Sequence, residues 1–192
     1  VAETLVFPSM VMAAGQAHLA DIKAVSSSYP SRGKLGTSGR PGEPGQEVAT
    51  GPEPGTVWLD ERMSAALNAS TGTAVTVGSS TLPVAAMLTR EPDRGVNFFS
   101  LAPRLMMHLD DVKATGLLQF GARIRYHLLL AGSEREIAAY RKWLEKQLTR
   151  GERLEDAGNA RPEIRSVLDR AERFLGLATL LTVILSAVAA AM

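Results

Sequence analysis

The chain has 192 residues, of which 45% are hydrophobic and 21% are charged, as is typical of a globular protein with a packed core. Its 21 basic and 20 acidic residues leave a net charge of +1, so the composition predicts no nucleic-acid partner, because phosphate backbones are bound by basic surfaces. The chain has no cysteine, which excludes disulfide bonds, thiol nucleophiles and zinc sites that contain cysteine.

The first 25 residues predict a small antiparallel sheet. Its strand-like stretches are residues 5–7, 10–13 and 18–25. Pro8 and Gly15 mark the breaks between them. Residues 27–56 follow and are rich in Gly and Pro, which cannot sustain a helix or a central strand. This segment is either a long loop or insert, or a disordered linker, because it contains few large apolar residues.

A strand and a short helix are predicted next. The strand covers residues 57–59, and Asp60 is the expected N-cap of a helix over residues 61–67. Residues 74–77 and 82–88 then predict a hairpin, in which Pro83 places the second strand at a sheet edge.

The remaining part of the predicted domain mixes strands and helices. Residues 105–109 are ambiguous, and residues 123–130 predict a strand that enters a core. Residues 134–149 predict an amphipathic helix whose apolar face consists of Ile137, Tyr140, Leu144 and Leu148. We therefore expect an α+β domain with antiparallel strands over residues 1–160.

Residues 161–173 predict an amphipathic helix that leads toward a membrane. Pro162 is tolerated at the first helical position, and Glu163 complements the positive end of the helix dipole. The apolar side then comprises Ile164, Val167, Leu168, Ala171 and Leu175. We expect this helix to lie along a soluble domain or a lipid surface and to enter the membrane near Arg173.

Residues 174–192 contain no charged residue and predict a transmembrane helix. As a helix they would be about 28 Å long, close to the roughly 30 Å of a bilayer core. The residues that favour insertion are Phe174, Leu175, Leu177, Leu180, Leu181, Val183, Ile184, Leu185 and Val188. A buried helix of a soluble core is the alternative. Because the chain begins at Val1 and ends in this apolar run, we interpret it as a fragment or a processed chain.

The sequence contains neither a complete phosphate loop nor a complete nucleophile elbow. Gly33-Lys34 has Ser28 where a phosphate loop needs its first Gly, so no ATP-binding loop is predicted. The sequence Gly36-Thr37-Ser38-Gly39-Arg40 is one residue out of register for the nucleophile elbow of a hydrolase. We predict no catalytic, cofactor-binding or metal-binding residue, and no cofactor.

The polar and aromatic residues that could belong to a functional site are each interpreted as structural. The three histidines, His18, His108 and His127, lack a second His at helical spacing and are interpreted as surface or hydrogen-bonded residues. Asp110-Asp111 is interpreted as a helix N-cap before Val112, rather than as an acid pair. In the turn formed by Glu91, Asp93 and Arg94, a local ion network is favoured over a binding role. Trp58 and Trp143 are expected to serve packing.

Several segments together resemble a known family. They are FPSM (7–10), KAVSSSYPSRGKL (23–35), GTVWLDERMSAAL (55–67), EPDRGVNFFSLAPRLMMHLDD (91–111), RYHLLLAG (125–132) and RPEIRSVLDRAERFLGLATLLTVIL (161–185). In this order they resemble the FtsX-like permeases of ABC transporters, in the YbbP-type branch. The resemblance implies that residues 1–160 are an extracytoplasmic domain comparable to the periplasmic core domain of MacB-like permeases, in the bacterial inner membrane.

The resemblance also implies a mechanism. Such permeases pair with a separate cytoplasmic ATP-binding subunit, and long helices transmit its closure to the outer domain. A continuous helix from Pro162 through Met192 would serve as such a lever. The cargo implied is hydrophobic or lipid-like, and this branch is associated with an esterase or lysophospholipase partner. The alternative is a membrane-anchored extracytoplasmic binding module that acts without ATP; an esterase-like enzyme has the least support.

Overall fold

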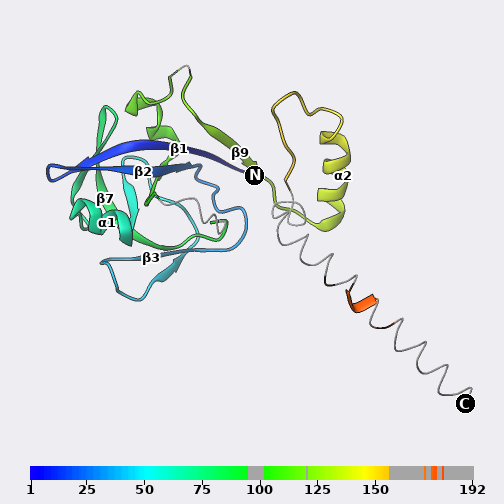
Figure 1. Cartoon of the computed structure of the whole chain (residues 1–192), viewed down its shortest axis with the longest axis horizontal. Coiled ribbons are helices and arrows are strands. Elements are labelled where there is room, and N and C mark those ends of the chain that lie inside the picture. Colours follow the sequence, from blue (N-terminus) through cyan, green and yellow to red (C-terminus); the bar gives the residue numbers. More distant parts are fainter. Residues whose placement is uncertain (95–101, 120, 156–170, 172–173, 177–178, 180–192) are drawn as a thin grey trace, which may run out of the picture. The chain divides into compact units, whose positions relative to one another are not determined.

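The computed structural model of the chain describes residues 1–94, 102–119, 121–155, 171, 174–176 and 179 (Figure 1). The chain divides into two compact units, Val1–Ile137 and Ala138–Met192. The first unit contains a mixed nine-stranded sheet and a short helix, so the α+β prediction is confirmed.

The sheet of the first unit closes on itself. The strands of the ring are β1 (Ala2–Ala13), β2 (Gln16–Val25), β8 (Arg104–His108), β5 (Val57–Asp60), β7 (Ser80–Arg90) and β6 (Ala74–Val77). In this order each strand pairs with the next, and β6 pairs with β1 again. The β2–β8 and β5–β7 pairs are parallel and the others are antiparallel. The ring therefore encloses a core, as in a small barrel.

Three further strands extend the ring. Within residues 27–56, β3 (Leu35–Ser38) pairs with β7, and β4 (Gln46–Val48) pairs with β3. The last strand, β9 (Arg125–Leu129), pairs with the first half of β1. Its residues are exposed, apart from half-buried Leu129, so the prediction that this strand enters a core is wrong. It lies beside the ring rather than within it.

Alternation along the strands separates two layers of apolar side chains. Val57 and Leu59 belong to the core inside the ring, whereas Trp58 between them packs in a second cluster outside it. Met106 likewise belongs to the outer cluster, between inner residues on β8. Because successive side chains of a strand point to opposite faces, buried strands of this kind read as continuous apolar runs.

The helix α1 (Glu61–Leu67) follows β5 directly, as predicted. A carboxylate oxygen of Asp60 accepts a hydrogen bond from the backbone N–H of Met63 at 2.8 Å, which caps the helix. Asn68 ends it in the left-handed conformation, with φ of 48°. Met63 and Leu67 are fully buried, so the helix is held by the core as well as by its cap.

The predicted break at Pro8 is wrong, because β1 runs unbroken through it. On one side Pro8 pairs with Asp21 of β2. On the other side β1 pairs with β9 up to Val6 and with β6 from Val11, which leaves Pro8 in the gap between these ladders. A residue without an N–H is tolerated where a strand edge is open.

The structure also decides the expectations for residues 105–109, for Asp110 and Asp111, and for the helix that begins at residue 134. The ambiguous stretch 105–109 is strand β8, and Asp110 and Asp111 lie within a 3₁₀ turn capped by His108. The predicted N-cap before Val112 is therefore wrong. The helix α2 (Glu134–Leu144) begins as expected but ends before residue 149.

The predicted membrane segments fall largely outside the described residues. These are the lead-in over residues 161–173 and the span over residues 174–192, of which only Ala171, residues 174–176 and Thr179 are described, all as helix. Among the described residues, no helix is long and apolar enough to cross a membrane.

Candidate functional site

The densest polar cluster of the described chain surrounds the turn after β7. We call Glu91, Asp93 and Arg94 the 91–94 anchor, because they tie this turn to the ring: Glu91 and Asp93 both pair with Lys23, Glu91 also with Arg104, and Arg94 with Asp60. The partners come from β2, from the start of β8 and from the end of β5. The ring therefore carries its charged groups on its outer face, beside the second apolar cluster.

Lys23 of β2 is the centre of this cluster. Its Nζ lies 2.6 Å from Oε1 of Glu91 and 2.8 Å from both carboxylate oxygens of Asp93, and it donates to the hydroxyl of Tyr29 at 2.9 Å. The side chain of Lys23 is 5% exposed and that of Glu91 is 1% exposed. A buried ammonium is stable only with such partners, and here all three of its donors have acceptors.

Asp93 is held ionised by its neighbours although its side chain is partly buried. Burial alone would raise the pKa of Asp93, but the charge of Lys23 and the hydrogen bonds from Lys23 and Tyr29 outweigh it and lower the pKa below its ordinary value. The hydroxyl of Tyr29 donates to Asp93. Burial, followed by this bond, raises the pKa of Tyr29 above its ordinary range, so the phenol stays protonated.

Arg104 connects the cluster to β8. Its Nη1 lies 2.8 Å from Oδ2 of Asp21, which stands opposite it in the β2–β8 ladder. Its Nε lies 3.3 Å from Oε2 of Glu91, close enough for ionic attraction but without hydrogen-bond alignment, so both atoms are buried without a hydrogen-bond partner. Attraction between these opposite charges offsets part of that cost.

Asp60 links the anchor to the helix α1. Its Oδ1 caps the helix, while its Oδ2 accepts hydrogen bonds from the backbone N–H of Arg104 at 2.9 Å and from Nη2 of Arg94 at 3.1 Å. Both oxygens of this carboxylate are thus occupied. Asp60 therefore acts as a structural junction of β5, β8 and the turn.

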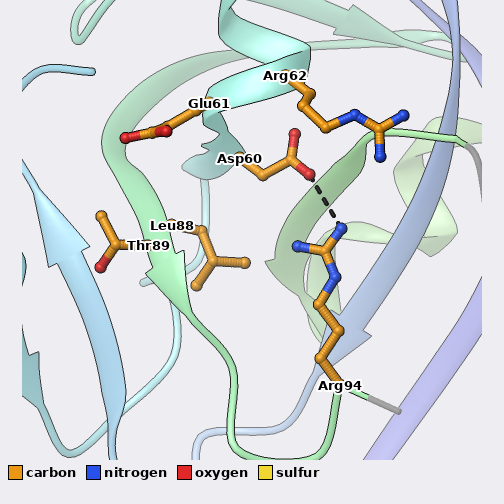
Figure 2. A pocket seen from close by; sticks show the side chains of 6 residues that line it. All are labelled: Asp60, Glu61, Arg62, Leu88, Thr89 and Arg94. Carbon is orange, nitrogen blue, oxygen red and sulfur yellow. Dashed lines mark hydrogen bonds and ion pairs between the residues drawn. The ribbon is translucent and has the colours of Figure 1, made fainter. Parts of the chain in front are cut away.

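A surface pocket of about 360 Å³ adjoins this junction (Figure 2). Its lining residues are Asp60, Glu61, Arg62, Leu88, Thr89 and Arg94. The acidic groups already have partners, because Asp60 holds Arg94, as Figure 2 shows, and Glu61 accepts from the backbone N–H of Gly42 at 3.0 Å. Both carboxylates of the pocket thus serve structural contacts.

The fold brings a serine, a histidine and an aspartate close together, a grouping that the sequence did not suggest. These residue types form the catalytic triads of serine hydrolases. Oγ of Ser27 lies 3.0 Å from Nε2 of His108, and Oδ2 of Asp110 lies 3.4 Å from Nδ1. However, the backbone N–H of Asp110 donates to Nδ1 at 3.3 Å, which places the ring proton on Nε2. Nε2 then donates to Ser27 and cannot accept its proton, so the trio lacks the tautomer that a serine hydrolase needs.

The structure thus favours the structural interpretation of the polar candidates. Glu91, Asp93 and Arg94 take part in an ion network, but it is not the local one that was predicted, because their ion-pair partners are Lys23, Arg104 and Asp60 on distant strands. The three histidines lie on different strands. Among the residues that the structure describes, no group of three or more His, Asp or Glu side chains is placed to hold a metal ion.

The comparisons with known proteins find one informative relative. No family model matches the chain. Over 191 residues it is 37% identical to a protein of Escherichia coli strain K12 described as the uncharacterized ABC transporter permease YbbP. The chain is related to the YbbP-type permeases. The match covers 100% of this chain and 23% of YbbP, so the chain spans less than a quarter of that relative.

Proposed function

We propose that this chain is a segment of a permease subunit of an ABC transporter. In this proposal residues 1–160 form an extracytoplasmic domain, residues 161–173 a lead-in helix and residues 174–192 a membrane span. The subunit couples ATP hydrolysis by a separate cytoplasmic subunit to the movement or extraction of a hydrophobic or lipid-like substrate. The observation that carries the proposal is the identity to YbbP along the whole chain.

Two properties of the chain accord with a mechanical rather than a catalytic role. The sequence lacks a phosphate loop, as expected if nucleotide is hydrolysed on another subunit. The charged groups of the 91–94 anchor pair with Lys23, Arg104 and Asp60 and so tie three strands to one turn. A domain that transmits displacement must be stiff, and such a network stiffens it.

The direct test is copurification of the full-length protein that contains this chain. In mild detergent we expect a stoichiometric ATP-binding subunit and ATP hydrolysis that requires both proteins. A matched control replaces the phosphate-loop Lys of the ATP-binding subunit, which should abolish hydrolysis and keep the complex. A homogeneous protein without such a subunit would contradict the proposal and favour an anchored binding module instead.

The resemblance is the sole basis for adding an extracytoplasmic esterase or lysophospholipase as a second partner. Recovery of such an enzyme in the same complex, with lipid bound to the permease, would support a lipid cargo. Recovery of the ATP-binding subunit alone, with no bound lipid, would count against both additions and leave the permease assignment intact.

A further inference from the structure

The helix α2 presents apolar side chains to solvent. None of its residues is buried. Ile137 and Tyr140 are each 37% exposed and Trp143 is 55% exposed, with the Tyr140 and Trp143 ring centroids 5.4 Å apart. Trp143, which was expected to serve packing, thus contacts Tyr140 on the surface of the helix rather than the core. Apolar side chains grouped on the exposed surface of one helix indicate a candidate contact surface.

These side chains form a stripe with charged borders. At 3.6 residues per turn, Ile137, Tyr140 and Leu144 share one side of the helix and Trp143 lies at its edge. Arg141 adjoins the Ile137 border, and its exposed pair with Glu145 at 2.9 Å is weak in water. Arg135, Lys142 and Ala138 occupy the opposite, polar side.

Glu136 falls within the stripe but does not prevent it from meeting an apolar phase. It lies in the first turn and accepts hydrogen bonds from the backbone N–H of Ser133 at 3.0 Å and from its hydroxyl at 2.6 Å. This is a capping box, which turns the carboxylate toward the helix start. These bonds lower the pKa of Glu136 below its ordinary value.

We propose that α2 lies on the membrane surface, with Ile137, Tyr140 and Trp143 inserted at the level of the lipid headgroups. The inference rests on the proposed function, in which residues 174–192 cross the bilayer and hold this stretch of chain near it. Tyr and Trp favour the membrane interface because their rings are apolar and their polar tips stay wet. Arg141, which borders the stripe, is placed to meet lipid headgroups.

The dimensions of the stripe favour lipid over a protein partner. A helix of 11 residues is about 16 Å long, so one narrow side of it offers only a small part of the roughly 800 Å² that each partner contributes to a stable protein interface. A lipid surface accepts a small apolar stripe and leaves its charged borders in water.

The two tryptophans of the chain make the proposal measurable. Trp58→Phe leaves Trp143 as the single emitter, and Trp143→Phe leaves Trp58, which is 8% exposed inside the fold. The chain carrying each substitution is reconstituted in vesicles of phosphatidylethanolamine and phosphatidylglycerol, with and without brominated acyl chains. We expect brominated lipid to quench Trp143 but not Trp58, and acrylamide to quench Trp143 less in vesicles than in detergent. If Trp58→Phe does not fold, the difference between the unmodified chain and Trp143→Phe isolates the same signal.

Each other outcome overturns the proposal in a recognisable way. If the chain floats with the vesicles but Trp143 stays open to acrylamide, the helix lies in water and the proposed membrane span survives. Protection from both quenchers would mean that protein covers the stripe. A chain that does not float with the vesicles would contradict the membrane span as well.

Matched variants on α2 separate insertion from helix stability. Ile137→Asn removes an apolar group from the stripe and should reduce bromolipid quenching of Trp143 roughly twofold or more. Ala138→Asn places the same side chain on the polar side and should leave the quenching unchanged. Equal quenching in both variants would contradict the assigned orientation of the helix.

Discussion

Lys23 is the residue on which the 91–94 anchor depends. Lys23→Met keeps much of the aliphatic volume but leaves the buried carboxylate of Glu91 without its ammonium partner at 2.6 Å. Removal of one member of a buried ion pair costs about 3–5 kcal/mol. We expect this loss in the free energy of unfolding, measured by chemical denaturation of the chain in mild detergent.

The control is Lys34→Met, which removes an exposed ion pair with Glu47 at 3.1 Å. Exposed pairs contribute about 0–1 kcal/mol. Equal effects of the two substitutions would show that Lys23 is not a buried structural partner.

The pairing of Asp93 with Lys23 predicts that the folded chain loses stability in acid. Its folded-state pKa lies below its ordinary value, so it stabilises the fold fully above the ordinary pKa, near 4, and progressively less as pH falls through the folded-state pKa. The melting temperature should therefore fall as pH is lowered from about 5. Asp93→Asn should flatten this dependence and lower stability at neutral pH. An unchanged acid slope in Asp93→Asn would contradict the pairing with Lys23.

Sequence reasoning found the three charged residues of the turn but not their partners. Glu91, Asp93 and Arg94 stand within four residues, so their part in an ion network was predictable. Lys23 and Arg104 were not, because the parallel β2–β8 pairing that brings them together joins strands distant in sequence. A signal was present: Lys23 is a charged residue inside an apolar strand, a position that requires a buried partner.

At the scale of elements, the turn between β6 and β7 depends on one glycine. Gly78 has φ of +59°, and a Cβ there would lie 2.1 Å from the carbonyl oxygen of Thr115. That carbonyl also accepts a hydrogen bond from the N–H of Ser79 at 2.8 Å, which fixes the approach. Gly78→Ala should therefore destabilise the chain by about 3 kcal/mol or more.

Gly72→Ala is the matched control. Gly72 has φ of +89°, but a Cβ there would meet no atom within 4 Å. Only backbone strain remains, which costs about 1–2 kcal/mol. Thermal unfolding of both variants separates the cost of the clash with Thr115 from the cost of backbone strain. A smaller loss of stability in Gly78→Ala than in Gly72→Ala would contradict the packing of the turn against Thr115.

Elements with local signals were predicted best. The helix α1 was found with its bounds because Asp60 caps it and its apolar positions follow directly. β1 was split wrongly at Pro8, since the open ladder edge that tolerates a proline is a tertiary feature. Closure of the ring, and the exposure of β9, depend on pairings between distant strands that no local pattern encodes.

At the scale of the whole molecule, the proposed lever predicts a defined loss of coupling. Gly or Pro scanned through residues 165–173 should break a rigid helix and reduce transport per ATP hydrolysed, while hydrolysis itself continues. Arg165→Ala, which preserves helix propensity, is the control and should keep coupling. The measurement needs the full-length permease with its ATP-binding subunit in vesicles. Unchanged coupling throughout the scan would exclude the lever.

The proposed permease requires that the six-stranded ring lie on the outer side of the cytoplasmic membrane. The chain has no cysteine, so a single introduced thiol reports its side. Met12 is 53% exposed on β1, and Met107 is fully buried in the core. In intact cells that carry the full-length protein, with any cysteines elsewhere replaced, a membrane-impermeant maleimide should label Met12→Cys and not Met107→Cys. Labelling of Met12→Cys only after cell lysis would place the ring in the cytoplasm and contradict the permease account.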